Sequence, residues 1–172
     1  MTWDEYFISI AKTVSKKSKD PSTKIGAVIV DENHRPISFG YNGLPQGAKE
    51  EFLTLTERPL KYHYVIHAEM NAILFAKRDL SNCTLYCEYA PCDSCLKHII
   101  QAGIKEVIYE KLFVNSVNSD REKTMTDKAS LEALRGLLVS SNIKVMNYTT
   151  NKTLLQEINE RNPEWYSKRL EL

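Results

Sequence analysis

The residues with the clearest chemical potential are one histidine, one glutamate and two cysteines. His67 and Glu69 belong to the sequence His-Ala-Glu, and Cys92 and Cys95 belong to Pro-Cys-Asp-Ser-Cys. One imidazole and two thiolates can hold zinc, and a site with three protein ligands keeps a fourth position for water, as catalytic zinc sites do. The offset of two residues on a helix points Glu69 away from His67, so we expect the carboxylate beside the metal. Acidified water and a proton-carrying carboxylate predict a hydrolytic enzyme.

A structural zinc site is an alternative for the same cysteines. It would normally need a fourth cysteine or histidine, and Cys87 and His98 are the candidates. His98 lies three residues beyond Cys95 and can reach the same helix face. Cys87 lies with Cys83 on one face of an apolar strand, which predicts two core thiols.

Hydrophobic periodicity alternates between helix and strand along the chain. Helical spacing predicts helices at residues 3–18, 67–78, 92–102, 128–140 and 153–161, and short apolar runs predict strands at 25–30, 36–41, 83–87, 106–109 and 143–147. Strands that alternate with helices imply right-handed crossovers and parallel pairs. We therefore predict an α/β fold: a three-layer α/β/α sandwich with a mixed five-stranded sheet.

Both predicted ligand segments lie at helix starts. The positive ends of two helices would then face one spot, which favours thiolates.

The stretch before His67, residues 48–64, is polar and irregular, and a loop of this length in a compact domain is more often functional than idle.

Composition narrows the possible classes of protein. The 172 residues predict a single domain, and 42% hydrophobic and 26% charged residues are typical of a soluble globular protein. The net charge of +1 argues against a partner that is a long nucleic acid. No apolar run has membrane-spanning length and the N-terminus lacks a signal-peptide core, so we expect a cytoplasmic protein with reduced cysteines and no membrane partner.

Three further stretches accompany the His-Ala-Glu and Pro-Cys-x-x-Cys motifs. They are Ser-Lys-Asp-Pro-Ser-Thr-Lys-Ile-Gly-Ala-Val at 18–28, Gly-Tyr-Asn-Gly-Leu-Pro at 40–45, and Ile-Ile-Gln-Ala-Gly-Ile-Lys-Glu-Val at 99–107. With them the chain resembles the cytidine and deoxycytidylate deaminase superfamily, whose zinc members carry an H-x-E…P-C-x-x-C signature. The Gly-Tyr-Asn-Gly stretch selects the dCMP (deoxycytidylate) deaminases within it. The resemblance spans most of residues 15–110.

This resemblance implies zinc-dependent hydrolysis of dCMP to dUMP and ammonia, which supplies dUMP for thymidylate synthesis. His67, Cys92 and Cys95 would hold Zn²⁺, and Glu69 would be the catalytic proton carrier. The resemblance also implies a homo-oligomer, usually a hexamer. It implies activation by dCTP and inhibition by dTTP, with Mg²⁺ accompanying the effector triphosphate.

Further site residues follow from the same resemblance. Asn42 is predicted to bind the deoxyribose hydroxyl, Ser22, Thr23 or Lys24 the phosphate, and Ala68 and Pro91 to shape the pocket around the pyrimidine. The predicted effector residues are Gly40, Tyr41, Asn42, Gly43, Arg58 and Lys61.

Two other functions are compatible with the motifs. One is deamination of cytidine or adenosine in tRNA or single-stranded DNA, which would require a basic groove with aromatic platforms. The other is a zinc-stabilised binding module without enzyme activity. In the preferred interpretation, residues 1–172 form one zinc-dependent deaminase domain, with an effector-type loop around 40–64 and a C-terminal helix and tail after 150.

Overall fold

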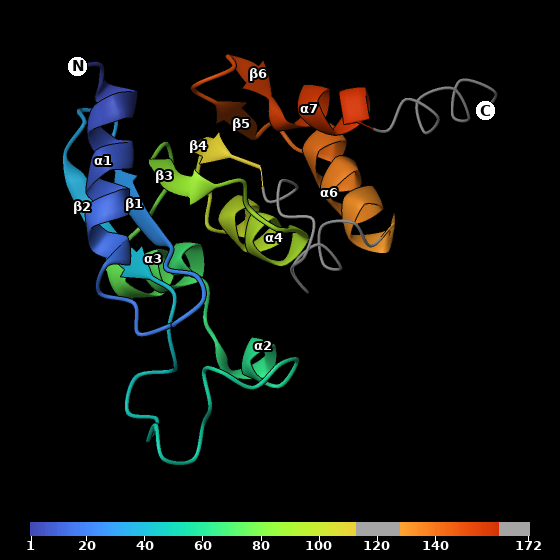
Figure 1. The fold of residues 1–172 in the computed structure, drawn as a ribbon. Helices are drawn as coiled ribbons and strands as arrows, with labels where there is room; N and C mark the ends of the chain where they lie inside the picture. The colour runs from blue at the N-terminus through green and yellow to red at the C-terminus, as the bar shows by residue number, and fades with distance from the viewer. Residues whose placement is uncertain (113–127, 162–172) are drawn as a thin grey trace.

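The fold is built on one mixed six-stranded sheet (Figure 1). The computed structural model describes residues 1–112 and 128–161. The spatial order of the strands is β2-β1-β3-β4-β5-β6. Their bounds are Gly26–Val30 for β1, Pro36–Tyr41 for β2, Thr84–Tyr89 for β3, Glu106–Lys111 for β4, Lys144–Asn147 for β5 and Lys152–Thr153 for β6.

Parallel and antiparallel pairs share this sheet. Strand β1 runs antiparallel to both β2 and β3, β3 to β5 run parallel to one another, and β6 is antiparallel to β5. The parallel pairs require crossovers, which helices supply. The helix bounds are Trp3–Ser15 for α1, Lys61–Tyr64 for α2, Ala68–Ala76 for α3, Asp93–Gln101 for α4, Lys128–Ser140 for α6 and Leu154–Arg161 for α7.

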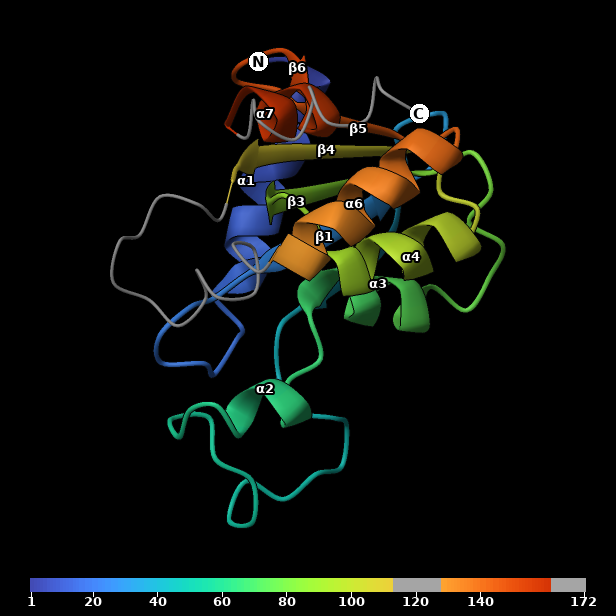
Figure 2. The same cartoon turned by 90° about the vertical axis from the view of Figure 1, so that its right-hand side faces the viewer.

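Helices cover both faces of the sheet. On one face, Phe7, Ile8 and Ala11 of α1 pack with Val28 and Val30 of β1. On the other face, apolar side chains of α3, α4, α6 and α7 form a second core with alternate strand residues. Figure 2 shows α3, α4 and α6 on the side opposite α1. The predicted three-layer α/β/α sandwich is therefore confirmed.

Burial explains why the sequence of the central strand β1 is a continuous apolar run. All five residues of β1 are buried, because one half of its side chains faces α1 and the other half faces α3. Strand β2, at the edge of the sheet, alternates instead, with Phe39 and Tyr41 exposed and Ser38 and Gly40 buried.

Several elements differ from the sequence prediction. The sheet has a sixth strand, β6, which was missed because two residues, Lys152 and Thr153, are too few for an alternating pattern. Helix α1 ends at Ser15 rather than at residue 18, and α2 lies within the stretch predicted as irregular. Strand β4 extends to Lys111, two residues beyond the strand predicted at 106–109. Residues 162–172 of the predicted tail lie outside the described residues.

A buried carboxylate joins the last helix to the sheet. Glu157 of α7 accepts a hydrogen bond of 2.5 Å from the Tyr109 hydroxyl of β4 and one of 3.0 Å from the Asn147 amide of β5. The Thr150 hydroxyl donates to the same carboxylate at 2.8 Å. These bonds satisfy the buried charge with donors from two strands and a turn, so α7 is part of the packed domain.

No helix in the two described ranges combines the length and the apolar character that crossing a membrane requires.

Candidate active site

The predicted ligands lie at the starts of two neighbouring helices. His67 is the N-cap of α3 and Cys92 is the N-cap of α4, both with extended backbone conformations. Both were predicted to be the first residue of a helix. In the structure each helix begins one residue later, at Ala68 and at Asp93. The Cys92 sulfur accepts a hydrogen bond from the Cys95 backbone N–H at 3.4 Å, which caps α4.

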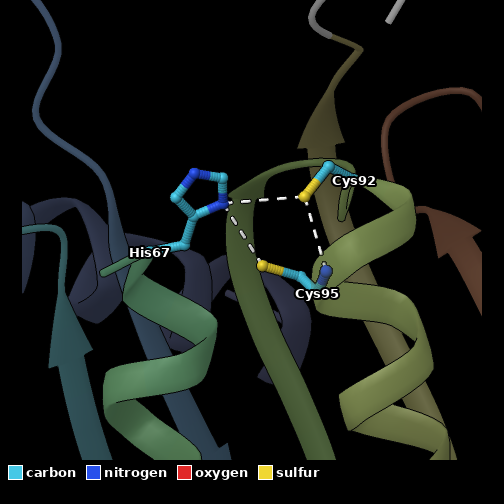
Figure 3. A group of neighbouring side chains, drawn as sticks. All are labelled: His67, Cys92 and Cys95. Carbon is cyan, nitrogen blue, oxygen red and sulfur yellow. Dashed lines mark hydrogen bonds between the residues drawn. The ribbon is translucent and has the colours of Figure 1, made fainter. Parts of the chain in front are cut away.

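One imidazole nitrogen faces both sulfurs. The Nδ1 atom of His67 lies 3.6 Å from Cys92 Sγ and 3.3 Å from Cys95 Sγ (Figure 3). A tetrahedral zinc with ordinary Zn–N and Zn–S bond lengths separates its nitrogen and sulfur ligands by about 3.6 Å. The two observed distances are close to that value, so the three side chains fit zinc by both geometry and donor type.

The two thiols are unequal in acidity. The pKa of Cys92 is lowered to about 4, chiefly because the Cys95 thiol donates a hydrogen bond to it, with a further contribution from the His67 ring. The same hydrogen bond raises the pKa of Cys95, and burial raises it further. A divalent cation between the sulfurs would stabilise both as thiolates, as metal binding to cysteine pairs requires.

Glu69 lies in the first turn of α3, and its side chain is buried. Among the described residues, the group that brings three ligand atoms close together is His67, Cys92 and Cys95, and it does not include Glu69. The pKa of Glu69 is raised, chiefly because burial disfavours the charged form. Glu69 thus lines the same cavity as the ligand cluster without belonging to it, and a buried carboxylate of raised pKa is a group that can carry a proton.

The candidates for a fourth ligand lie elsewhere. His98 is exposed, and its Nδ1 lies 2.6 Å from the Ser94 carbonyl oxygen within α4. Cys87 is fully buried in the core. Within the described ranges neither residue joins the ligand cluster. Among the described residues the cluster therefore has three protein ligands, the number that catalytic zinc sites have.

A cavity of about 520 Å³ opens onto the cluster. This volume lies in the range of small-molecule binding sites. The lining comes from four parts of the chain: Asp20 and Ile25; Asn42; residues 61–62, 65–67, 69, 70 and 74; and residues 92–95. The lining thus includes the zinc ligands and Glu69, together with the turn before β1, the residue after β2, and residues of α2.

The predicted substrate residues are only partly brought together. Asn42 lines the cavity and is buried. Ser22 hydrogen-bonds to the cavity residue Lys61. Lys24 is exposed, and Ala68 and Pro91 are buried; none of these three lines the cavity.

The predicted effector residues are spread over two regions. Gly40 packs against α3, where an added Cβ would lie 2.1 Å from the Ala68 carbonyl oxygen. Tyr41 is exposed, and Gly43 forms a β-bridge with Ile66 just before His67. Arg58 is half-buried ahead of α2. Lys61 lines the cavity itself.

Asp20 and Tyr62 line the cavity but were missed by the sequence reasoning. In the sequence, Asp20 was noted only as part of the stretch at 18–28. Its carboxylate accepts hydrogen bonds from the Lys61 ammonium group at 3.0 and 3.1 Å, and both residues are almost completely buried. Burial opposes ionisation of Asp20, but hydrogen bonds from Ser22 and Lys61 lower its pKa to about 2.

The fold and the three-ligand site are those of a class of zinc-dependent hydrolytic enzymes. Comparison with known sequences places the chain in such a class. The family described as "Cytidine and deoxycytidylate deaminase zinc-binding region" matches residues 1–111. The chain belongs to this family, as its resemblance to deaminases predicted.

The similar proteins within this family narrow the class. The chain is 42% identical to the deoxycytidylate deaminase of Mus musculus over 130 residues, which cover 72% of this chain and 71% of the mouse protein. It is 43% identical to the Homo sapiens deoxycytidylate deaminase over 115 residues, which cover 63% of this chain and 65% of the human protein. The dCMP deaminase of cyanophage S-TIM5, solved in complex with dCMP and dUMP, is 26% identical with a TM-score of 0.58, covering 83% of this chain and 94% of the phage chain.

Proposed function

We propose that this protein hydrolyses dCMP to dUMP and ammonia. The observation that carries the proposal is the cluster of His67, Cys92 and Cys95 with the buried Glu69 in one cavity of nucleotide size. Similarity to deoxycytidylate deaminases of mouse and human supports the choice of substrate.

The site residues divide the chemistry between them. His67, Cys92 and Cys95 would hold Zn²⁺, which would lower the pKa of a bound water. Glu69 takes a proton from that water and delivers it to N3 of the pyrimidine. The water oxygen bonds to C4, and Glu69 then takes the second proton from that oxygen. Glu69 delivers this proton to the amino group as the C4–N4 bond breaks and the C4 oxygen becomes a carbonyl. One dCMP and one water thereby become one dUMP and one ammonia.

The remaining groups of the cavity hold the nucleotide. Asn42 binds the deoxyribose hydroxyl, since its buried side chain faces the same cavity as the zinc ligands. Outside the lining itself, Ser22, which hydrogen-bonds to the cavity residue Lys61, and the exposed Lys24 bind the phosphate. Ala68 and Pro91, both buried, support the wall around the base. The neutral balance of charges across the chain fits a single nucleotide better than a polymer.

Regulation and assembly complete the proposal. dCTP activates and dTTP inhibits, each with Mg²⁺, at a site around Gly40, Tyr41, Gly43 and Arg58. Asn42 and Lys61, which were also predicted to belong to that site, line the cavity of the zinc ligands and are assigned to the substrate side. The active form is a cytoplasmic homo-oligomer, a hexamer in the preferred interpretation, and the exposed Phe39 and Tyr41 on edge strand β2 are apolar surface available to such contacts.

The test is ammonia release by the purified protein together with its zinc content. We expect about one zinc per chain and turnover of dCMP well above that of cytidine or a cytosine-containing oligonucleotide. Turnover of the oligonucleotide above dCMP would replace this proposal with nucleic-acid deamination. A protein that contains zinc but releases no ammonia from any of these substrates would instead be a zinc-stabilised binding module. Rates with and without dCTP and dTTP, and the mass in solution, test regulation and assembly separately.

A further inference from the structure

Asn42 is held in place by the turn that precedes β1. Its Oδ1 accepts a hydrogen bond from the Ile25 backbone at 2.8 Å, and its Nδ2 donates to the Thr23 carbonyl at 2.9 Å. Its backbone carbonyl accepts a bond of 2.7 Å from the Ser18 hydroxyl. The orientation of the Asn42 side chain in the cavity therefore depends on the shape of residues 18–25.

Asp20 sets the shape of that turn. Its Oδ1 accepts hydrogen bonds from the Ser22 backbone at 2.9 Å, the Ser22 hydroxyl at 2.8 Å and the Thr23 backbone at 3.1 Å. An aspartate that binds backbone N–H groups two and three residues ahead closes a local turn. The carboxylate thus fixes Thr23, to which the Asn42 amide is bonded.

Lys61 fixes the carboxylate from a distant part of the chain. Its ammonium group lies 3.1 and 3.0 Å from the two Asp20 oxygens and 2.6 Å from the Ser22 hydroxyl oxygen. These contacts occupy the three protons of the ammonium group. The side chains are 2% and 1% exposed, so the pair is screened from water.

Stability alone gives little reason for such a pair. Taking two charges out of water costs about as much as their attraction returns, and apolar replacements of buried pairs are often neutral or stabilising. Asp20, Asn42 and Lys61 all line the same cavity. The chain of contacts from Lys61 through Asp20 and Thr23 therefore ends on a side chain that faces the substrate space.

We infer that the Asp20–Lys61 ion pair is a positioning device for Asn42, which it aims at the 3′-hydroxyl of the nucleotide sugar. The inference rests on the proposed function and adds a specificity role that no single motif indicates. Asp20 and Lys61 are positioning residues, since they act through the turn at 18–25. The carbon that reacts is placed separately, by the zinc ligands and Glu69 at the starts of α3 and α4.

The test compares dCMP with 2′,3′-dideoxycytidine monophosphate, which lacks the 3′-hydroxyl. The wild-type protein should prefer dCMP by about tenfold in kcat/KM, the value of one hydrogen bond at a buried site. In Lys61→Met, KM for dCMP should rise about tenfold, kcat should change by less than about threefold, and the preference should fall to near one. Lys49→Met is the matched control, because Lys49 is an exposed lysine of the same segment, and it should behave as wild type.

A second variant separates positioning from folding. Asp20→Asn with Lys61→Met removes both charges but keeps an oxygen for the Ser22 and Thr23 N–H groups. Because Lys61 no longer fixes the side chain at position 20, this variant should lose the same preference. It should also unfold at a higher temperature than Lys61→Met alone, since no unpaired buried charge remains.

The outcomes are distinct. Equal losses on both nucleotides, or a retained preference for dCMP, would show a purely structural pair and overturn the inference. No ammonia from dCMP with the wild-type protein would refute the proposed function instead. The positioning role of the ion pair would then be tested by calorimetry, which measures the affinity for dUMP and for its dideoxy counterpart. Lys61→Met must again remove the preference for the nucleotide with a 3′-hydroxyl.

Discussion

Glu69 and His67 are two residues apart, yet the backbone directs their side chains to different places. His67 has extended dihedral angles at the N-cap of α3, whereas Glu69 lies inside the first turn. The imidazole therefore faces the sulfurs of α4, and the carboxylate is buried beside them. The change from extended to helical backbone between the two residues therefore sends the two side chains to different places, which suits the proposed division between metal binding and proton transfer.

Replacing Glu69 by glutamine should leave zinc bound and stop turnover. The amide has nearly the same shape but cannot carry a proton, and general acid–base catalysis contributes about 10²–10⁴-fold in rate. We expect kcat for dCMP to fall by at least about 100-fold, with about one zinc per chain by metal analysis. A Glu69→Gln protein that kept a near-normal rate would remove Glu69 from the mechanism.

The ligands were predictable at this scale, but their supporting residues were not. His67, Cys92 and Cys95 were found by spacing, because residues that share a metal recur at short, fixed offsets. Asp20 and Lys61 are 41 positions apart, and no periodic signal links a turn residue to a lysine in an irregular stretch. Burial of that pair is a property of the folded chain, so composition and pattern did not reveal it.

At the scale of elements, apolar patterns predicted the strands β1 to β5, the parallel pairs and the long helices. The strand predicted at 36–41 and the helix predicted at 128–140 have the observed bounds. Strand β6 and helix α2 were missed because each has four residues or fewer, less than one repeat of a pattern. Such short elements form because neighbouring segments pair with them.

Gly40 provides a test of packing between β2 and α3. A Cβ at this position would lie 2.1 Å from the Ala68 carbonyl oxygen and 2.4 Å from the Ala72 nitrogen, both backbone atoms of α3. Because neither atom can move without shifting the helix, Gly40→Ala should lower the free energy of unfolding by about 3 kcal/mol or more. Denaturant unfolding measures this loss, and zinc content should fall as the start of α3 shifts.

Gly136 is the matched control on α6. An added Cβ there meets nothing within 4 Å, and alanine favours a helix over glycine. Gly136→Ala should therefore raise the free energy of unfolding by about 0.5–1 kcal/mol. Equal effects of the two substitutions would contradict the packing of Gly40 against α3.

The turn held by Asp20 makes stability depend on pH. Its pKa is lowered from 3.8 to about 2 in the folded chain, so the carboxylate stabilises the fold fully above about pH 5 and loses this contribution as pH falls from about 4 to 2. The shift corresponds to about 2 kcal/mol. The difference in unfolding free energy between wild type and Asp20→Asn should accordingly shrink toward pH 2.

Urea titrations of both proteins at several pH values supply this measurement. Loss of zinc in acid affects the two proteins alike and cancels in the difference. A difference that stayed constant from pH 6 to pH 2 would mean that these hydrogen bonds do not lower the pKa of Asp20 in the folded protein.

At the scale of the whole molecule, the zinc ligands connect two helices of the same layer. Removing the metal with a chelator should lower the melting temperature by about 10 °C, because a ligand at about 1,000 times its Kd stabilises a domain by about 4 kcal/mol. Readdition of zinc should restore both the melting temperature and the release of ammonia.

Two variants calibrate this measurement. Cys92→Ser combined with Cys95→Ser should melt at the lower temperature and show no response to the chelator. His98→Ala should respond as wild type does, since His98 bonds within its own helix. A chelator response lost in His98→Ala would instead identify a fourth protein ligand and a structural metal.

The bond between Tyr109 and Glu157 has a consequence for where this molecule can be divided. The family match ends at residue 111, directly after β4, yet the Tyr109 hydroxyl depends on a carboxylate 48 residues later. A fragment cut at that boundary would uncover one side of β4 and leave the tyrosine oxygen without its acceptor. Such a fragment should therefore aggregate or be degraded, and the smallest portion worth expressing alone extends through Arg161.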